Sequence, residues 1–270
     1  MVSDPRGPVH VDGEVVATKK VGAYRHLTLA APGVPEQFRA GNFVAVSAAG
    51  HVARRALWVH RVRESSAFGP TLDVVVEVRG SGTAWLAAQP VGARIAITGP
   101  LGRAFALPKE VVSCLLIGEG YAAAPLFPLA ERLRERGCAV SLVVSAPDEA
   151  HLLSALEARR SVRSVTVLTA DGSVGQRGGV TDHIGGLVER GEPDVVYAAG
   201  PVPVLHHVAA AAERSGVWSQ VAVEVPTPCG TGLCHGCPLP VLGEDGVARV
   251  VRACTEGPVI RGDRVRWDQL

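Results

Sequence analysis

Features that would indicate a membrane, secreted or nucleic-acid-binding protein are missing from this sequence. No apolar run approaches the roughly 18–20 residues that a membrane-spanning helix needs, and Met1–Gly7 contains no apolar signal-peptide core. The formal net charge is only +1, which excludes the basic surface of a nucleic-acid binder. We therefore expect a cytoplasmic protein with no membrane or nucleic-acid partner.

Arrangements typical of side-chain catalysis are missing as well. No Ser/His/Asp set or pair of carboxylates stands out, so we predict no catalytic residue. What the chain does have is the size and composition of an ordinary globular protein. Its 270 residues suffice for two domains with separate cores.

Six cysteines carry most of the functional information. In a reducing compartment, clustered cysteines indicate metal or redox ligands rather than disulfides. Cys114 and Cys138 each stand alone in an apolar run and are interpreted as core residues. The other four cysteines lie within the last 42 residues.

These four cysteines have the spacing of a plant-type [2Fe–2S] site. Four residues separate Cys229 from Cys234, two separate Cys234 from Cys237, and sixteen separate Cys237 from Cys254; this is the C-x4-C-x2-C pattern with a distant fourth ligand. Three intervening glycines let the backbone fold closely around a small cluster. A four-thiolate zinc site is the alternative, and His235 is interpreted as a loop residue rather than a ligand.

Residues 10 to about 98 predict an antiparallel barrel or sandwich, because short strands alternate with turn signals containing glycine and proline. The expected strands are Val11–Thr18, His26–Ala30, Phe43–Ser47, Leu57–Val62, Leu72–Val78 and Arg94–Thr98.

After Gly99–Gly102 the pattern changes to strands that alternate with helices, which predicts a doubly wound parallel sheet. Residues 111–117 form a continuous apolar run typical of a strand buried on both faces. Further strands are expected at Val140–Ser145, Val162–Thr169, Asp194–Ala199 and Val221–Val225. Helices are expected around residues 126–133, from Asp148 to about Arg159, from Thr181 to about Glu189, and from Val202 to Arg214.

The tail from Pro226 to Leu270 is too short for a core of its own and is expected to be a loop-rich module held together by its metal centre. The predicted domains are therefore residues 1–104, 105–225 and 226–270.

The order of several short motifs makes nearly the whole chain resemble the electron transfer subunit of NAD-dependent dihydroorotate dehydrogenase, within the ferredoxin-reductase-like flavoproteins. The motifs are Ala40-Gly41-Asn42-Phe43-Val44, Arg54-Arg55-Ala56-Leu57-Trp58, Gly80-Ser81-Gly82-Thr83, Gly99-Pro100-Leu101-Gly102, Tyr197-Ala198-Ala199-Gly200-Pro201, the cysteine module and Gly257-Pro258-Val259.

The resemblance implies an FAD-binding barrel, a nicotinamide domain and a [2Fe–2S] module. FAD would be bound by Arg55, Ala56, Leu57, Trp58, Val75, Val76, Glu77, Gly80, Gly82 and Thr83. The NAD co-substrate would meet Gly118, Gly120, Gly200 and Pro201, and the cluster would be held by Cys229, Cys234, Cys237 and Cys254. Asp171-Gly172-Ser173 is expected on the same rim of the sheet as the NAD loops.

The chain departs from the family pattern at a few positions. Ala56 and Trp58 replace the family's proline and serine, Glu77 stands where an arginine is frequent, and Glu119 replaces a glycine. These carboxylates oppose dinucleotide binding unless they turn outward or pair.

The resemblance further implies that electrons pass from the FMN of a catalytic subunit through the cluster to FAD and then to NAD⁺, in pyrimidine biosynthesis. The implied assembly is a hetero-oligomer, specifically a heterotetramer, with Leu233, Pro238 and Leu239 on an apolar surface around the cluster. Two alternatives stay open at this point. One is service in another redox complex, of the NADH–ferredoxin oxidoreductase, sulfhydrogenase or sulfite reductase type, and the other is a flavin-poor regulatory or binding subunit stapled by its metal.

Overall fold

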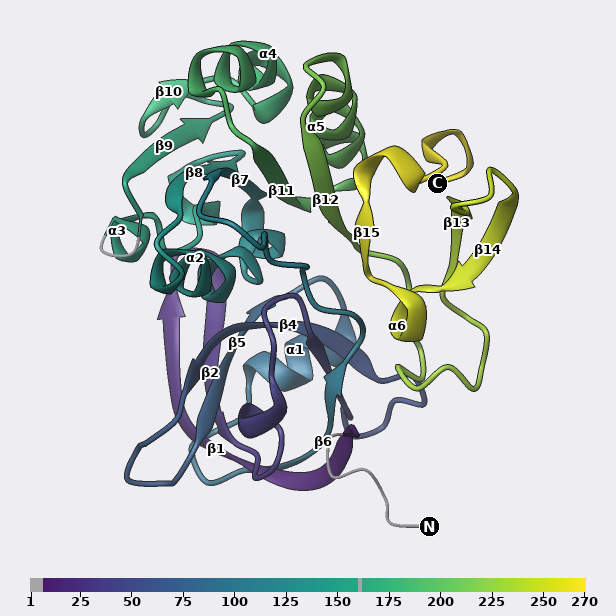
Figure 1. Cartoon of the computed structure of the whole chain (residues 1–270). Helices are drawn as coiled ribbons and strands as arrows, with labels where there is room; N and C mark the ends of the chain where they lie inside the picture. The colour runs from purple at the N-terminus through teal and green to yellow at the C-terminus, as the bar shows by residue number, and fades with distance from the viewer. Residues whose placement is uncertain (1–6, 160–161) are drawn as a thin grey trace.

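Short strands near the amino terminus close into an antiparallel barrel, which lies at the bottom of Figure 1. The computed structural model describes residues 7–159 and 162–270, so the expectation of no signal-peptide core at residues 1–6 lies outside the described residues. Around the barrel the strand order is β1-β2-β5-β4-β3-β6. The strands are β1 (Val9–Val21), β2 (Tyr24–Ala30), β3 (Phe43–Val46), β4 (Arg55–Arg63), β5 (Thr71–Glu77) and β6 (Arg94–Leu101).

Side-chain alternation along each strand gives the barrel two apolar faces. In β5, Leu72, Val74 and Val76 point into the barrel core, whereas Val75 belongs to the larger core shared with the rest of the molecule. Successive side chains of a strand point to opposite faces, and a strand buried on both faces reads as a continuous apolar run. The barrel is therefore packed inside and also along the wall that faces the second domain.

The second domain is a seven-stranded sheet with strand order β10-β9-β8-β7-β11-β12-β15. Neighbouring strands are parallel except for β15, which pairs with β12 antiparallel. Helix α2 packs between this sheet and strand β4 of the barrel, and α4 and α5 pack on each other. The strands are β7 (Ser113–Glu119), β8 (Ala139–Ala146), β9 (Ser164–Thr169), β10 (Gln176–Arg177), β11 (Val195–Gly200), β12 (Trp218–Val223) and β15 (Val259–Arg261).

The α-helices and 3-10 helices connect these strands. The α-helices are α1 (Ser81–Ala87), α2 (Leu126–Glu135), α3 (Ala155–Ala158), α4 (Val180–Gly191), α5 (Val202–Arg214) and α6 (Ala253–Glu256). The 3-10 helices are η1 (Pro35–Gln37), η2 (Gly120–Ala123), η3 (Glu149–His151), η4 (Gly262–Arg264) and η5 (Trp267–Gln269). No helix in the described parts of the chain is long and apolar enough to cross a membrane.

The tail, yellow-green to yellow in Figure 1, is more regular than expected. It contains an antiparallel hairpin of β13 (Pro238–Leu242) and β14 (Ala248–Arg252), and it returns through β15 to the edge of the parallel sheet. The backbone N–H of Arg103 donates to the carbonyl of Gly257 at 2.6 Å. The tail is therefore attached to both domains.

Three local expectations are corrected. The helix expected from Asp148 to Arg159 is only the turn η3 and the short α3. Asp148 does cap that turn, by accepting from the His151 N–H at 3.0 Å, but Ser154 adopts a left-handed φ of 48° that interrupts a continuous helix. Helix α4 begins after Gly179 instead of at Thr181, with the Asp182 carboxylate accepting from the Gly179 N–H at 2.8 Å. Helix α1 was not expected at all.

Candidate functional site

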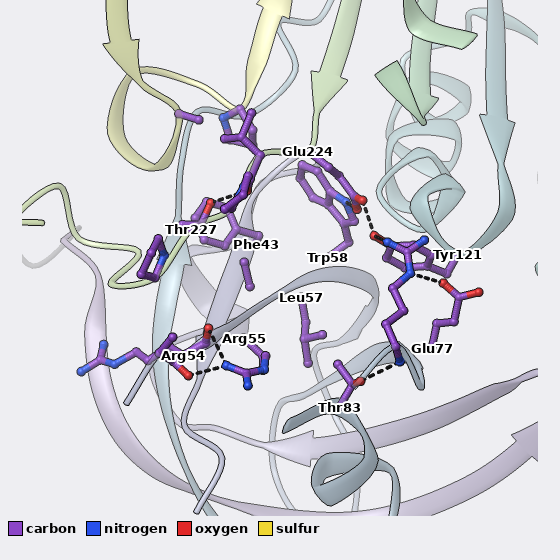
Figure 2. Close-up of a pocket in the computed structure, with 18 of the residues that line it drawn as sticks. Phe43, Arg54, Arg55, Leu57, Trp58, Glu77, Thr83, Tyr121, Glu224 and Thr227 are labelled. Atoms are coloured by element: carbon purple, nitrogen blue, oxygen red, sulfur yellow. Dashed lines mark hydrogen bonds and ion pairs between the residues drawn. The ribbon is translucent and has the colours of Figure 1, made fainter. Parts of the chain in front are cut away.

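A cavity of about 490 Å³ lies where the barrel, the parallel sheet and the tail meet (Figure 2). Six separate stretches of the chain form its wall, contributed by the barrel, the sheet domain and the tail. The lining residues are Phe43, Ala53–Trp58, Val75, Glu77, Arg79, Thr83, Tyr121, Val223–Pro228, Ala253 and Pro258.

Most of the residues expected at the flavin lie on this wall. Arg55, Ala56, Leu57, Trp58, Val75, Glu77 and Thr83 line the cavity. Val76, in contrast, is fully buried in the barrel core, because it points to the opposite face of β5 from Val75. Val76 is therefore corrected to a barrel-core residue.

The guanidinium of Arg55 packs directly against Gly82 at the start of α1. A Cβ atom on Gly82 would lie 2.1 Å from Nη2 of Arg55, so only glycine leaves room for the guanidinium. Nη1 of Arg55 donates to the carbonyl of Ala53 at 2.5 Å. The hydroxyl of Thr83 accepts from the N–H of Gly80 at 3.2 Å. A guanidinium at a helix amino terminus is a suitable position for an anionic phosphate.

Glu224 is the central polar group of the cavity. Its Oε1 accepts from Nε1 of Trp58 at 2.6 Å, and its Oε2 accepts from the hydroxyl of Tyr121, as Figure 2 shows. Burial raises the pKa of Glu224 above its usual range, although the hydrogen bonds from Tyr121 and Trp58 lower it. This carboxyl thus joins residues of the barrel, the sheet and the tail.

Arg79 neutralises the carboxylate of Glu77, one of the two that oppose dinucleotide binding. Its Nε lies 2.5 Å from Oε2 of Glu77, and its guanidinium carbon lies 4.3 Å from the centre of the Tyr121 ring. The charge of Glu77 is therefore paired at the cavity. Arg79, Tyr121 and Glu224 were missed from the sequence, although the position of Arg79 directly before Gly80 was a signal that could have found it.

The residues expected at the nicotinamide lie outside this cavity, on one rim of the sheet. Gly118 and Gly120 are at the carboxyl end of β7, and Gly200 ends β11, the neighbouring parallel strand; Pro201 follows. Glu119 lies between these loops. Burial raises its pKa, while a hydrogen bond from Ser145 lowers it. The second unfavourable carboxylate is thus partly buried and hydrogen-bonded.

The cysteine loop brings two of its four thiols into contact. Sγ of Cys237 lies 3.3 Å from Sγ of Cys254. In the described residues, no group of three or more His, Cys, Asp or Glu side chains gathers as a site for one metal ion.

Backbone amides point at the sulfurs in this loop. The N–H of Thr231 lies 3.4 Å from Sγ of Cys229, and the N–H of Gly236 lies 3.3 Å from Sγ of Cys234. Burial raises the pKa of the Cys229 thiol, but hydrogen bonds from Cys234 and Thr231 outweigh it and bring that pKa to about 6. Gly230 and Gly232 adopt positive φ angles of 73° and 80°, which glycine allows without strain.

The surface around the loop is only partly as expected. Leu233 is 84% exposed and Pro238 is exposed. Leu239 is fully buried, because it points from β13 into the core on the face opposite Pro238. Leu239 is therefore removed from the expected apolar surface. His235 is exposed.

Comparison with known proteins identifies the tail and then the whole chain. Residues 228–266 match the iron–sulfur cluster binding domain of dihydroorotate dehydrogenase B. A dihydroorotate dehydrogenase B (NAD(+)) electron transfer subunit of Bacillus caldolyticus is 32% identical, over 93% of this chain and 96% of that protein. A homolog of this subunit in Thermotoga maritima is 30% identical, over 88% of this chain and 82% of that protein.

A solved structure shows the same architecture. It is that of an NADH-dependent reduced ferredoxin–NADP oxidoreductase studied for flavin-based electron bifurcation. Its chain is 29% identical and superimposes with a TM-score of 0.83, covering 96% of this chain and 91% of its own. The predicted fold of barrel, parallel sheet and iron–sulfur module is thereby confirmed.

These matches also confirm the cofactor class. The iron–sulfur domain decides between iron and the zinc alternative that spacing had left open, and the ferredoxin-reductase-like fold supports FAD, with NAD as co-substrate. The chain is an electron transfer component of an oxidoreductase. It belongs to the family of dihydroorotate dehydrogenase B electron transfer subunits.

Proposed function

We propose that this chain takes electrons from the FMN of a dihydroorotate dehydrogenase catalytic subunit and delivers them through a [2Fe–2S] cluster and FAD to NAD⁺. When bound, the cluster supplies one-electron transfer and the flavin converts single electrons into a hydride. The protein itself binds, orients and shields these groups.

The observation that carries this proposal is that the cavity and the cysteine loop share a wall. Pro226, Thr227 and Pro228 line the cavity, and Cys229 is the next residue along the chain. On the other side, Ala253 lines the cavity and precedes Cys254. Two redox groups held in these places would be close neighbours, as electron transfer between them requires.

The residues at the cavity fit a flavin dinucleotide. Leu57, Trp58 and Val75 provide apolar walls for the ring. Arg55, seated on Gly82, provides the positive charge for a phosphate group. The loops at Gly118–Gly120 and Gly200–Pro201 lie at the carboxyl ends of adjacent parallel strands, where dinucleotides bind in open sheets, and we assign the nicotinamide nucleotide to them.

The cysteine loop fits an iron–sulfur centre. Its four thiols have the C-x4-C-x2-C spacing with a distant fourth cysteine, and residues 228–266 match an iron–sulfur cluster binding domain. The amides of Thr231 and Gly236 would stabilise negative charge on the sulfurs.

The partner surface is assigned to the exposed side of the cysteine loop. Leu233 extends from this loop into solvent, and an exposed apolar side chain at a redox site is suited to a buried protein interface. We propose a hetero-oligomer in which the catalytic subunit covers Leu233, with a heterotetramer as its stoichiometry and the cytoplasm as its compartment.

Anaerobic purification of the complete chain tests the proposal. We expect about two irons, two sulfides and one FAD per chain, and flavin reduction on addition of NADH. Co-expression with an FMN-containing dihydroorotate dehydrogenase subunit should give a stable complex that reduces NAD⁺ with dihydroorotate. Iron-free material, or a chain with iron and no flavin, would contradict the proposal; the second result indicates a flavin-poor regulatory subunit.

A second candidate keeps the same module and changes the partner. It is favoured by the superposition on a ferredoxin–NADP oxidoreductase chain at a TM-score of 0.83. A chain that binds both cofactors, oxidises NADH and fails to bind the dihydroorotate dehydrogenase subunit would indicate this other redox complex.

A further inference from the structure

A short segment, Glu224–Pro228, connects the end of β12 to the first cysteine of the loop. We refer to it as the strap. It lines the cavity along its whole length. Two of its five residues are prolines, whose φ angles are fixed, and the Thr227 hydroxyl donates to the carbonyl of Val225 at 2.9 Å. A displacement of one end of the strap is therefore transmitted to the other.

Both ends of the strap are attached to the start of β4. At the far end, the backbone N–H of Arg54 donates to the carbonyl of Pro228 at 3.0 Å. At the near end, Nε1 of Trp58 donates to the carboxylate of Glu224 at 2.6 Å. Arg54 and Trp58 flank the Arg55–Leu57 stretch of the cavity wall, so the same part of the barrel forms the cavity and holds the strap.

Trp58 makes its contact with the strap from a buried position. The indole N–H is directed at the strap in this structure, and the ring is buried, at 7% exposure. Its ring packs edge-on against Phe43, with centroids 6.3 Å apart. The hydrogen bond to Glu224 is therefore made by a side chain that has little freedom to move.

The sheet domain holds the same carboxylate from the other side. Tyr121, in η2 directly after β7, donates to the second oxygen of Glu224, and Arg79 covers the Tyr121 ring. Both carboxylate oxygens are thus engaged. One oxygen accepts a hydrogen bond from Trp58 of the barrel. The other accepts from Tyr121, in the segment that follows Gly118 and Gly120.

We propose that Glu224 is a positioning residue that fixes the cysteine loop relative to the flavin cavity, with Trp58 and Tyr121 as its two supports. The inference rests on the proposed function, because it needs a cluster in the loop and a flavin in the cavity. It assigns to Trp58 a role in the placement of the cluster, through the indole N–H that holds Glu224.

The test compares Trp58→Phe and Glu224→Gln with the wild-type holoprotein, purified anaerobically. Phe keeps the buried aromatic ring and removes only the N–H, and Gln is nearly isosteric with Glu. The measurements are iron, sulfide and flavin content, the EPR spectrum and midpoint potential of the cluster, and the rate of electron transfer between the cluster and the flavin after rapid reduction by NADH.

Trp267→Phe is the matched control. Trp267 also lies in the tail, and its indole N–H donates to the carbonyl of Gly262 at 3.2 Å, but it does not line the cavity. We expect full cofactor content in all three variants. In Trp58→Phe and Glu224→Gln we expect an altered EPR spectrum and electron transfer slowed roughly tenfold, the size of effect seen when a residue that orients metal ligands is removed; Trp267→Phe should match the wild type.

The outcomes separate the two proposals. Wild-type protein without iron or flavin overturns the proposed function. Loaded variants with unchanged EPR spectra and transfer rates overturn the positioning role alone, as does an equal change in Trp267→Phe. If Trp58→Phe fails to fold, Tyr121→Phe, which removes one hydroxyl from a partly exposed side chain, gives the same comparison through the other support.

Discussion

The cysteine loop and the flavin cavity lie next to each other but are built in opposite ways. Three of the four thiols of the loop come from nine consecutive residues, Cys229–Cys237, and their geometry follows from local turns at Gly230 and Gly232. The cavity is assembled from six stretches between Phe43 and Pro258. The loop is thus a local structure, and the cavity exists only when three parts of the molecule are in place.

This difference determines what each site tolerates. A local loop fails when one ligand is lost, whatever the rest of the chain does. In an assembled cavity many residues each contribute part of the binding energy. A single substitution therefore lowers cofactor affinity only by the contacts of that residue. Variants that affect one site and leave the other intact test whether the two are as separate as their construction indicates.

The largest expected effect is loss of the cluster from the loop. In Cys234→Ser we expect no stable [2Fe–2S] cluster, because a hydroxyl is a poor replacement for a thiolate ligand, while the flavin stays bound to the cavity. Iron and sulfide assays with a visible spectrum measure this. Cys138→Ser, at a buried cysteine far from the loop in sequence, should keep its iron; equal loss in both variants would contradict the ligand assignment.

The converse change is Gly82→Ala, which should weaken FAD binding in the cavity and leave the cluster in the cysteine loop unchanged. The new Cβ would displace the Arg55 guanidinium, and loss of a charge-assisted contact to phosphate lowers FAD affinity about 10- to 100-fold. Flavin release on dilution or dialysis measures the change. Gly185→Ala, in α4, is the control, since a Cβ there meets nothing within 4 Å; if Gly82→Ala also holds FAD normally, Arg55 does not bind the phosphate.

A smaller effect is expected at the outer surface of the loop. Leu233→Glu should leave both cofactors in place and weaken binding of the catalytic subunit about tenfold, because a charge would be buried at an apolar contact. Sedimentation or calorimetry of the complex measures the affinity. Val52→Glu changes an equally exposed valine of the barrel and should bind normally. Wild-type affinity in Leu233→Glu would place the interface elsewhere.

The smallest effect is the dependence of stability on pH at the cavity. Because burial raises the pKa of Glu224, the fold favours its protonated form. The stability that this form contributes is present below the ordinary carboxyl pKa and is lost as the pH rises through the raised value. Glu224→Gln cannot ionise, so its Tm relative to wild type should rise from pH 4.5 to pH 7.5. A Tm difference that stays constant over this pH range would contradict the raised pKa of Glu224.

The same contrast explains what the sequence predicted. The spacing of Cys229, Cys234 and Cys237 indicated the cluster, because the ligands and the turns between them are neighbours in sequence. The motifs at Arg55 and Gly80–Thr83 located part of the cavity through the order of known family segments. The direct contact between Arg55 and Gly82 was not predicted, because it depends on how β4 and α1 pack.

Residues whose role depends on tertiary contacts were missed. Tyr121 and Glu224 meet only because the fold brings η2 and the end of β12 together at the cavity, although the two residues are 103 positions apart in sequence. Glu77 was expected to oppose a dinucleotide until Arg79 proved to neutralise it. The expected helix after Asp148 was wrong for a local reason, the left-handed backbone at Ser154, which no simple residue pattern signals.

Strand β15 connects the integrity of the metal centre to the stability of the parallel sheet. It begins five residues after Cys254 and covers the outer edge of β12. If oxidative damage released the cluster and loosened the tail, β12 would be left with an unpaired edge, the kind of surface that promotes aggregation. A damaged subunit would thereby become a substrate for cellular quality control, rather than persist as an inactive competitor for its partner.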